Sequence, residues 1–214
     1  SVSAKESKYF YIKTGEGFET VKENLVNRKV IGNTAWFNRV ASWLKYKSVK
    51  PGRYELKEGM SLYKLIKMLR AGEQSPVKMV ITKERTKELL AGKMGKKFDL
   101  ECDSLQMIRF LSSNDSLKNY GVDTNTVMAI VMPYTYSVNW NSSPEKIFEQ
   151  FYTAYKKFWT TERKVKAESL HLSPLKISAL ASIVEEETNK KADKYNIAST
   201  YLNRIKAGMK LQAD

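Results

Sequence analysis

The feature that most constrains the fold is an apolar helical repeat that ends in the run LASIVEEET, residues 180–188. Ser173 is a good N-cap residue and Pro174 suits the first helical position, so we expect a helix to begin there. At about 100° per residue, its apolar side chains fill one continuous arc. They are Ile177, Leu180, Ala181, Ile183 and Val184. This arc predicts a helix that packs against a neighbouring element along one face.

Three consecutive glutamates close this predicted helix and differ in their position around it. Glu186 points away from the apolar arc and should be solvated, whereas Glu185 lies at its margin and Glu187 within it. The negative end of the helix macrodipole makes a carboxylate there hold its proton more tightly, and partial burial acts in the same direction. An acid that donates a proton near neutral pH is what glycosidic cleavage needs. The spacing alone fits better with helix-end glutamates paired with Lys190, Lys191 or Lys194. Arg204 is a candidate partner for Glu187.

The scarcity of cysteine and histidine restricts the chemistry. Cys102 and His171 are the single residues of these types, so an internal disulfide and a Cys/His zinc cluster are excluded. The single histidine also argues against a nucleophilic triad that uses histidine as its base. We therefore expect no metal and no cofactor, and any catalysis has to come from carboxylates.

The charge balance predicts an anionic partner. The chain has 37 Lys and Arg against 23 Asp and Glu, a formal net charge of +14. Nucleic acid, anionic lipid and the carboxylate-bearing bacterial cell wall all fit such a charge. We expect no nucleic acid, because the basic residues are spread through all segments and no recognition motif accompanies them. No window reaches the roughly 18 apolar residues of a membrane-spanning helix.

Three strand-turn-helix units are predicted in the amino-terminal part of the chain. The first has a strand at 9–12 and a glycine turn at 15–17, followed by an amphipathic helix. The second has a strand at 53–56, a turn with Gly59 and a helix with Ser61 as N-cap. The third begins with a strand at 77–81. The irregular spacing between the units indicates weak internal repetition rather than a solenoid.

A further amphipathic helix is predicted at residues 34–45, between the first two units, from the spacing of Phe37, Ala41 and Leu44. It also carries Trp36 and Trp43. We expect both tryptophans to pack against the rest of this lobe. Stacking of either ring on a sugar is the alternative.

The Lys- and Gly-rich stretch 92–102 predicts the boundary between two lobes, 1–95 and 96–214. Beyond it, helices are predicted at 105–111, at 144–158 and 164–169, and after Asn189, where Gly208 suits an αL cap. The predicted fold class is α+β, with a small strand-turn-helix lobe followed by a mainly helical lobe.

Several motifs near the end of the chain are similar to the signature of the MltG/YceG-type endolytic murein transglycosylases. In that family an L-A-S-I-V-E segment is followed by N-R, G-M, L-Q and D-P-T, and this chain has LASIVE at 180–185, NR at 203–204, GM at 208–209 and LQAD at 211–214. The resemblance implies that Glu185 is the catalytic acid. It also implies supporting or substrate-binding roles for a second set of residues, namely Glu187, Asn203, Arg204, Gln212, Asp214 and Tyr134.

The resemblance implies cleavage of the bond between N-acetylmuramic acid and N-acetylglucosamine in peptidoglycan, with formation of 1,6-anhydro ends. One glutamate would act as both general acid and general base. The alternative is a module that binds peptidoglycan without cleaving it. Glycan strands are the implied partner, and cell-wall synthesis proteins are further candidates. The family also implies a single-pass anchor ahead of Ser1 in the inner or plasma membrane, with the catalytic part facing the periplasm or cell exterior.

Two further segments are similar to family elements, with departures. The middle strand-turn-helix unit resembles LysM modules, which bind peptidoglycan, although Arg85 stands where the third unit usually has glycine. MPYTY at 132–136 resembles an F-P-x-T-Y element, but Ala129 and Ile130 replace a usual E-G pair. The family continues after Asp214 into P-T and a further segment. We therefore expect an incomplete catalytic lobe in this chain, and activity that depends on the segment beyond Asp214.

Overall fold

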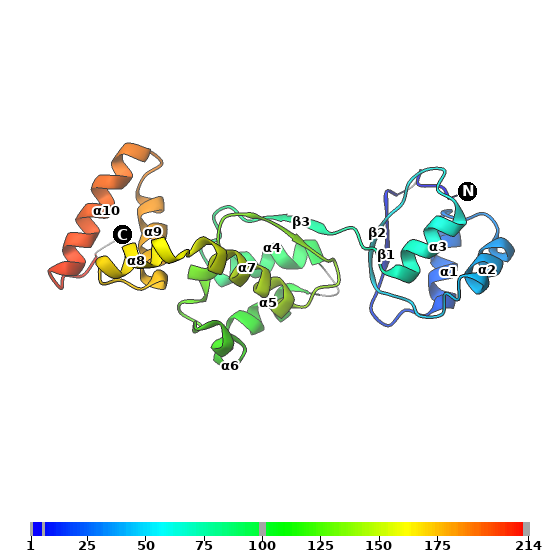
Figure 1. The fold of residues 1–214 in the computed structure, drawn as a ribbon, viewed down its shortest axis with the longest axis horizontal. Coiled ribbons are helices and arrows are strands. Elements are labelled where there is room, and N and C mark those ends of the chain that lie inside the picture. Colours follow the sequence, from blue (N-terminus) through cyan, green and yellow to red (C-terminus); the bar gives the residue numbers. More distant parts are fainter. Residues whose placement is uncertain (1, 6, 99–101, 212–214) are drawn as a thin grey trace. The chain divides into compact units, whose positions relative to one another are not determined.

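The structure, a computed structural model, describes residues 2–5, 7–98 and 102–211 (Figure 1). It is mixed α and β, mainly helical, with two small two-stranded sheets, so the predicted class is confirmed at that level. The chain forms two compact units. Unit 1 comprises Ser1–Ser112 and Pro133–Gln150, and unit 2 comprises Ser113–Met132 and Phe151–Asp214.

The first sheet of unit 1 joins β1 (Tyr9–Ile12) to β2 (Gly52–Glu55) in antiparallel register, with Tyr9 opposite Glu55. Alternate residues point to opposite faces of a strand, so one face of this pair carries Phe10, Ile12 and Tyr54, all buried. The strand predicted at 9–12 is confirmed. The second strand begins one residue before its predicted start.

Three helices bury their apolar faces beside this sheet: α1 (Phe18–Asn27), α2 (Thr34–Trp43) and α3 (Leu62–Ala71). The predicted N-cap Ser61 accepts a hydrogen bond from the backbone N–H of Lys64 at 3.2 Å. Asn33 caps α2 in the same way, through Trp36 at 3.0 Å. The helix side chains of this core are Val21, Leu25, Phe37, Ala41, Leu65, Ile66 and Leu69.

The expected packing of the two tryptophans of α2 is wrong. Trp36 is 55% exposed and Trp43 is 72% exposed. The cause is the helix geometry, since Phe37 and Ala41 form the buried stripe of α2 and the tryptophans lie on another face.

The second sheet of unit 1 pairs β3 (Val77–Val80) with β4 (Thr135–Val138), again antiparallel. Beside it in the sequence are α4 (Lys87–Phe98) and α5 (Ser104–Leu111), which contact one another closely. The Lys- and Gly-rich stretch expected as a lobe boundary is helical through Phe98, and the predicted division at 95/96 falls inside α4. A functional division into 1–95 and 96–214 stays a prediction.

The remaining elements are helical. They are α6 (Asn114–Leu117), η1 (Lys118–Tyr120), η2 (Val127–Ile130), α7 (Pro144–Phe158), α8 (Thr161–Ser169), α9 (Pro174–Glu187) and α10 (Lys191–Lys206). Proline at position 144 opens α7 as predicted, and Gly208 adopts the αL conformation just after α10, with φ of 67°. Ser113 is the N-cap of α6, and its hydroxyl accepts a hydrogen bond from the backbone N–H of Ser116 at 3.3 Å. Among the described residues, no helix combines the length and the apolar character needed to cross a bilayer.

Two buried tyrosines of unit 1 make a matched test of its packing. The Tyr54 hydroxyl donates a hydrogen bond to the Lys50 carbonyl at 2.7 Å, whereas the Tyr46 hydroxyl has no partner among the described residues. We expect Tyr54→Phe to lower the free energy of unfolding by about 1 kcal/mol, because the carbonyl loses its donor. Tyr46→Phe should not lower it. Urea unfolding at neutral pH measures both values, and equal losses would contradict this interpretation.

The same pair predicts a loss of stability in alkali. Burial raises the pKa of both Tyr46 and Tyr54 to about 12, from an ordinary value of 10.0. The folded state therefore holds these protons more tightly than the unfolded state. Their contribution is complete below pH 10 and is lost as the pH rises from about 10 towards 12. Unfolding measured across this range should show a smaller loss for the double Phe variant than for the parent chain.

Candidate functional site

Helix α9 has the start and the buried stripe that the sequence predicts. The Ser173 hydroxyl accepts a hydrogen bond from the backbone N–H of Lys176 at 3.3 Å, and Pro174 occupies the first turn. Leu180 and Val184 are buried in a small cluster with Tyr201 of α10. This cluster packs α9 against α10 and so fixes which carboxylates of α9 lie near α10.

The glutamates at the end of α9 are all exposed, so the expected partial burial of Glu185 or Glu187 is not found. The buried arc is narrower than predicted, because Ala181 is exposed and Ile177 and Ile183 are only half-buried. The Glu185 side chain is 47% exposed and forms an ion pair with Lys194 of α10. This is the pairing of the alternative interpretation, a helix-end glutamate held by a lysine later in the chain.

Glu187 is held by a different group. The Tyr201 hydroxyl donates a hydrogen bond to the Glu187 carboxylate at 2.6 Å. Arg204, the partner proposed from the sequence, lies one turn later on α10, and its guanidinium donates to the carbonyl of Leu211. Arg204 therefore ties the end of α10 to the segment after it, while Tyr201 fixes Glu187.

The other predicted site residues are spread over both units. Asn203 is exposed on α10. Gln212 and Asp214 lie outside the described residues. Tyr134 belongs to unit 1, is 44% exposed and has its ring centroid 6.3 Å from that of Tyr136, which is buried. The α9–α10 hairpin thus brings Glu185 together with Lys194 and Glu187 together with Tyr201, whereas Arg204 contacts Leu211.

The hydroxyl of Tyr201 was not predicted as a partner. The sequence places Tyr201 on the apolar face of α10, which the structure confirms by its burial. A tyrosine at the edge of such a face can keep its hydroxyl in reach of a polar group. The Tyr201–Glu187 hydrogen bond could have been predicted only as a tyrosine and a carboxylate that face each other on adjacent helices. That prediction requires the register of α10 against α9, which the sequence does not give.

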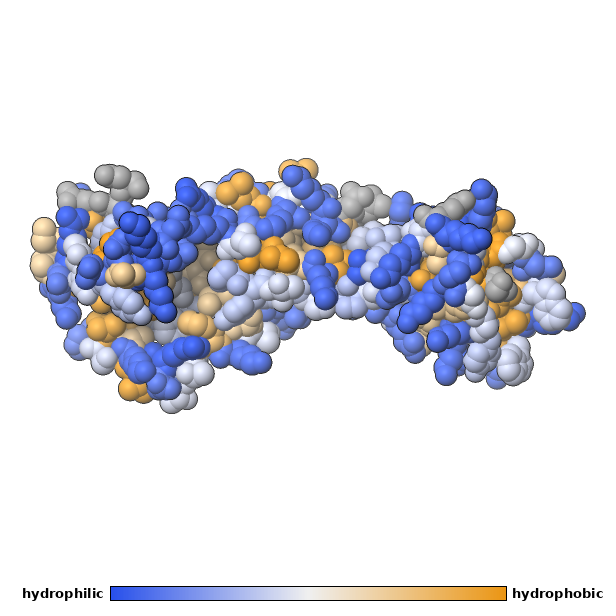
Figure 2. Space-filling view, turned by 90° about the horizontal axis from the view of Figure 1, so that it is seen from above, coloured by the Kyte–Doolittle hydropathy of each residue, from blue (hydrophilic) through white to orange (hydrophobic). Residues whose placement is uncertain are grey.

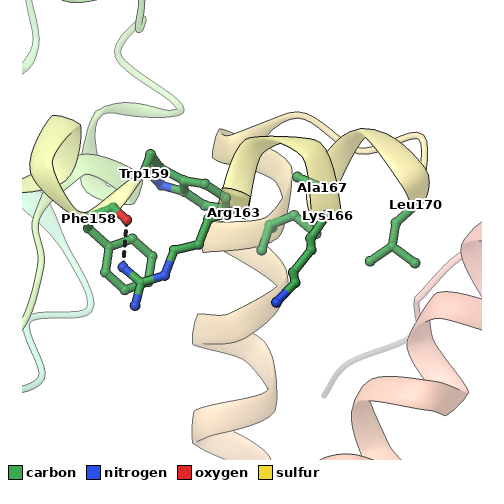
Figure 3. A pocket seen from close by; sticks show the side chains of 7 residues that line it. Phe158, Trp159, Arg163, Lys166, Ala167 and Leu170 are labelled. Atoms are coloured by element: carbon green, nitrogen blue, oxygen red, sulfur yellow. Dashed lines mark hydrogen bonds between the residues drawn. The ribbon is translucent and has the colours of Figure 1, made fainter. Parts of the chain in front are cut away.

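A hollow of about 270 Å³ lies beside the start of α9 (Figure 3). It is lined by Phe158, Trp159, Arg163, Lys166, Ala167, Leu170 and Ile177. The Arg163 guanidinium lies 4.1 Å from the centre of the Phe158 ring and donates to the Phe158 carbonyl at 2.6 Å. No carboxylate is among the residues that line this hollow, so it cannot supply acid catalysis by itself.

Metal binding has no obvious place in this site. In the described part of the chain, no three His, Cys, Asp or Glu side chains come close enough together to hold a metal ion. The carboxylates of the hairpin instead have a lysine and a tyrosine as partners.

Comparison with known proteins gives three findings. A model of the YceG-like family matches residues 10–214. A protein of Bacillus subtilis (strain 168) named endolytic murein transglycosylase is 25% identical over 225 residues, covering 95% of this chain and 60% of the relative. The chain thus spans about 60% of the length of that relative. A crystal structure of a yceG-like protein from Listeria monocytogenes has a TM-score of 0.56 and 23% identity, over 98% of this chain and 74% of that one, which shows a similar fold.

Proposed function

Because the chain belongs to the YceG-like family, as its LASIVE, NR and GM motifs predict, we propose that it is the greater part of an endolytic lytic transglycosylase of peptidoglycan. The observation that carries this proposal is the family match over residues 10–214, which includes Glu185 and the whole α9–α10 hairpin. The name of the Bacillus relative supports murein as the substrate class.

Glu185 is the proposed general acid and base. In the protonated form it donates its proton to the oxygen between N-acetylmuramic acid and N-acetylglucosamine, and the C1–O bond breaks through an oxocarbenium-like state. The resulting carboxylate then takes the proton of the C6 hydroxyl, whose oxygen bonds to C1 and closes a 1,6-anhydro ring. The glutamate ends protonated as it began, and no water is consumed.

The ion pair with Lys194 sets a condition on this mechanism. An ammonium group beside a carboxylate favours its ionised form, and an ionised Glu185 has no proton to donate. Lys194 therefore has to leave Glu185 before the acid step. A carboxylate of the peptide attached to the glycan is a suitable new partner for the lysine, so substrate binding itself would release the acid.

The other site residues have supporting roles in this proposal. Glu187, fixed by the Tyr201 hydroxyl, shapes the end of α9 behind Glu185. Asn203 offers an exposed amide to the glycan, and Arg204 orders the segment that leads to Gln212 and Asp214. Tyr134 offers an exposed ring for a sugar.

We further propose that the amino-terminal lobe, residues 1–95, is LysM-like and binds the same glycan. The support is local geometry, since Gly59 takes the αL conformation in the turn after β2 and Ser61 caps the helix after that turn. Action at the cell envelope follows from the substrate, and a single-pass anchor ahead of Ser1 remains part of the proposal, with the catalytic part facing outwards.

A non-catalytic wall-binding module is the second candidate. It is favoured by the exposure of Glu185 and its pairing with Lys194, which together describe an ordinary surface carboxylate. The two candidates differ in what they do to purified peptidoglycan sacculi. Soluble fragments with 1,6-anhydromuramic ends support the transglycosylase, whereas retention of the protein on sacculi that stay intact supports the binding module.

A further inference from the structure

The outer face of α2 carries an unusual set of exposed aromatic rings. Two of the four tryptophans of the chain, Trp36 and Trp43, lie on it, more than half exposed. Tyr63 at the start of α3 is also exposed, and its ring centroid is 5.7 Å from that of Trp43, with the planes inclined by 43°. The packing of α2 against α3 brings these rings together. We call Trp36, Trp43 and Tyr63 the aromatic face.

The spacing along α2 gives the aromatic face a definite repeat. Trp36 and Trp43 are seven residues apart, which places them on the same side of the helix and about 10 Å apart along its axis. One disaccharide of an extended β-1,4-linked amino-sugar strand has close to this length. Rings at this separation therefore match every second sugar of such a strand, whose apolar C–H faces stack on aromatic rings.

The charged groups on the aromatic face fit an anionic strand. The Arg39 guanidinium lies 5.1 Å from the centre of the Trp36 ring, on the side of the helix that Trp43 shares. Lys67 is exposed one turn after Tyr63 on α3. A peptidoglycan strand carries carboxylates on its peptides, and these cations border the aromatic face.

The composition of the face argues against insertion into a lipid surface. Helices that bind membranes bury large aliphatic side chains together with their aromatic rings. In α2 and α3, all of whose residues are described, every Val, Leu, Ile and Met is half-buried or buried. Figure 2 shows hydrophilic side chains over much of the visible surface, with hydrophobic side chains between them. Arg39 lies between the two tryptophans on this side of α2, as suits a polar polymer.

We propose that the aromatic face is a glycan-binding platform that stacks on a β-1,4-linked amino-sugar strand, with Trp36 and Trp43 two sugars apart. This inference deepens the proposed function, because it locates a contact with the substrate that is separate from Glu185. It also differs from the turn at Gly59, the proposed LysM-like contact. The platform would hold a strand while the carboxylate acts on it.

The test is binding of chitohexaose, a β-1,4-linked N-acetylglucosamine hexamer, followed by tryptophan fluorescence and calorimetry. Trp36→Ala and Trp43→Ala should each weaken the affinity about tenfold, the expected loss for one ring contact. The gain in affinity from the disaccharide to the hexasaccharide should vanish in either variant, because a disaccharide cannot reach both rings. Leu105→Ala, which removes an exposed side chain of α5, is the matched control and should bind normally.

Two outcomes would overturn the platform. One is that the parent chain and both tryptophan variants bind chitohexaose with the same affinity, or that none of the three binds it. The other is binding to anionic phosphatidylglycerol vesicles that depends on both tryptophans while chitohexaose does not bind. Chitohexaose contains no muramic acid, so its binding is measured independently of anhydro-ring formation at Glu185. If the catalytic proposal fails, the binding result can still be interpreted. If the platform proposal fails, the role proposed for Glu185 is unaffected.

Discussion

Glu185→Gln should reduce the release of 1,6-anhydro fragments from purified sacculi by at least about 10²-fold, the usual contribution of a general acid. The amide keeps the size of the side chain but has no proton of suitable acidity to donate and cannot accept the C6 hydroxyl proton. The measurement is mass spectrometry of soluble fragments, made on a chain extended past Asp214 to the length of the Bacillus relative.

Glu186→Gln is the matched control for this result. Glu186 adjoins Glu185 on α9, carries the same charge and is also exposed. Its replacement should leave fragment release within about twofold, and both variants should unfold within about 1 kcal/mol of the parent, since surface ion pairs contribute little. Equal activity of the Glu185 variant and the parent would remove Glu185 from the mechanism.

The second large effect is expected at Phe37, on the buried side of α2. Phe37 is fully buried and its ring lies 5.8 Å from that of Phe18, at an angle of 26°. Phe37→Ala should lower the free energy of unfolding by about 3–5 kcal/mol, through lost burial and the cavity it leaves. Because α2 also presents the aromatic face, the same variant should lose chitohexaose affinity. Urea unfolding and the binding assay measure the two effects.

Trp36→Ala separates stability from binding. Trp36 directly precedes Phe37 in the sequence but is exposed, so its removal should change the free energy of unfolding by only about 0.5 kcal/mol. The two neighbours therefore have different profiles: Phe37→Ala should lose both stability and binding, whereas Trp36→Ala should lose binding alone. A destabilisation by Trp36→Ala as large as that of Phe37→Ala would show that α2 packs differently.

Helix starts and ends were predictable because they depend on short-range chemistry. Ser61 and Ser173 accept hydrogen bonds from backbone N–H groups three residues later, and Pro144 and Gly208 mark positions that suit their fixed or permissive backbones. None of these interactions needs a distant part of the chain. The family was also predictable, since its motifs combine several residue types at fixed spacing.

Contacts between elements were harder to predict. Strand β4 was not foreseen, because its partner β3 lies more than fifty residues earlier in the sequence and four residues carry little pattern of their own. On α2, both the buried stripe and the exposed tryptophans repeat at helical spacing, so periodicity alone does not say which faces inward. For Glu187, the choice between Tyr201 and Arg204 depends on the register of α10 against α9.

The most direct test of the central claim, that Glu185 closes an anhydro ring without water, is digestion of sacculi in water labelled with oxygen-18. The account predicts muramic ends that carry no label and that are lighter by one water than reducing ends. Reducing ends labelled with oxygen-18 would show hydrolysis and would contradict it. Sacculi that stay intact while retaining the protein would contradict it in favour of a wall-binding module.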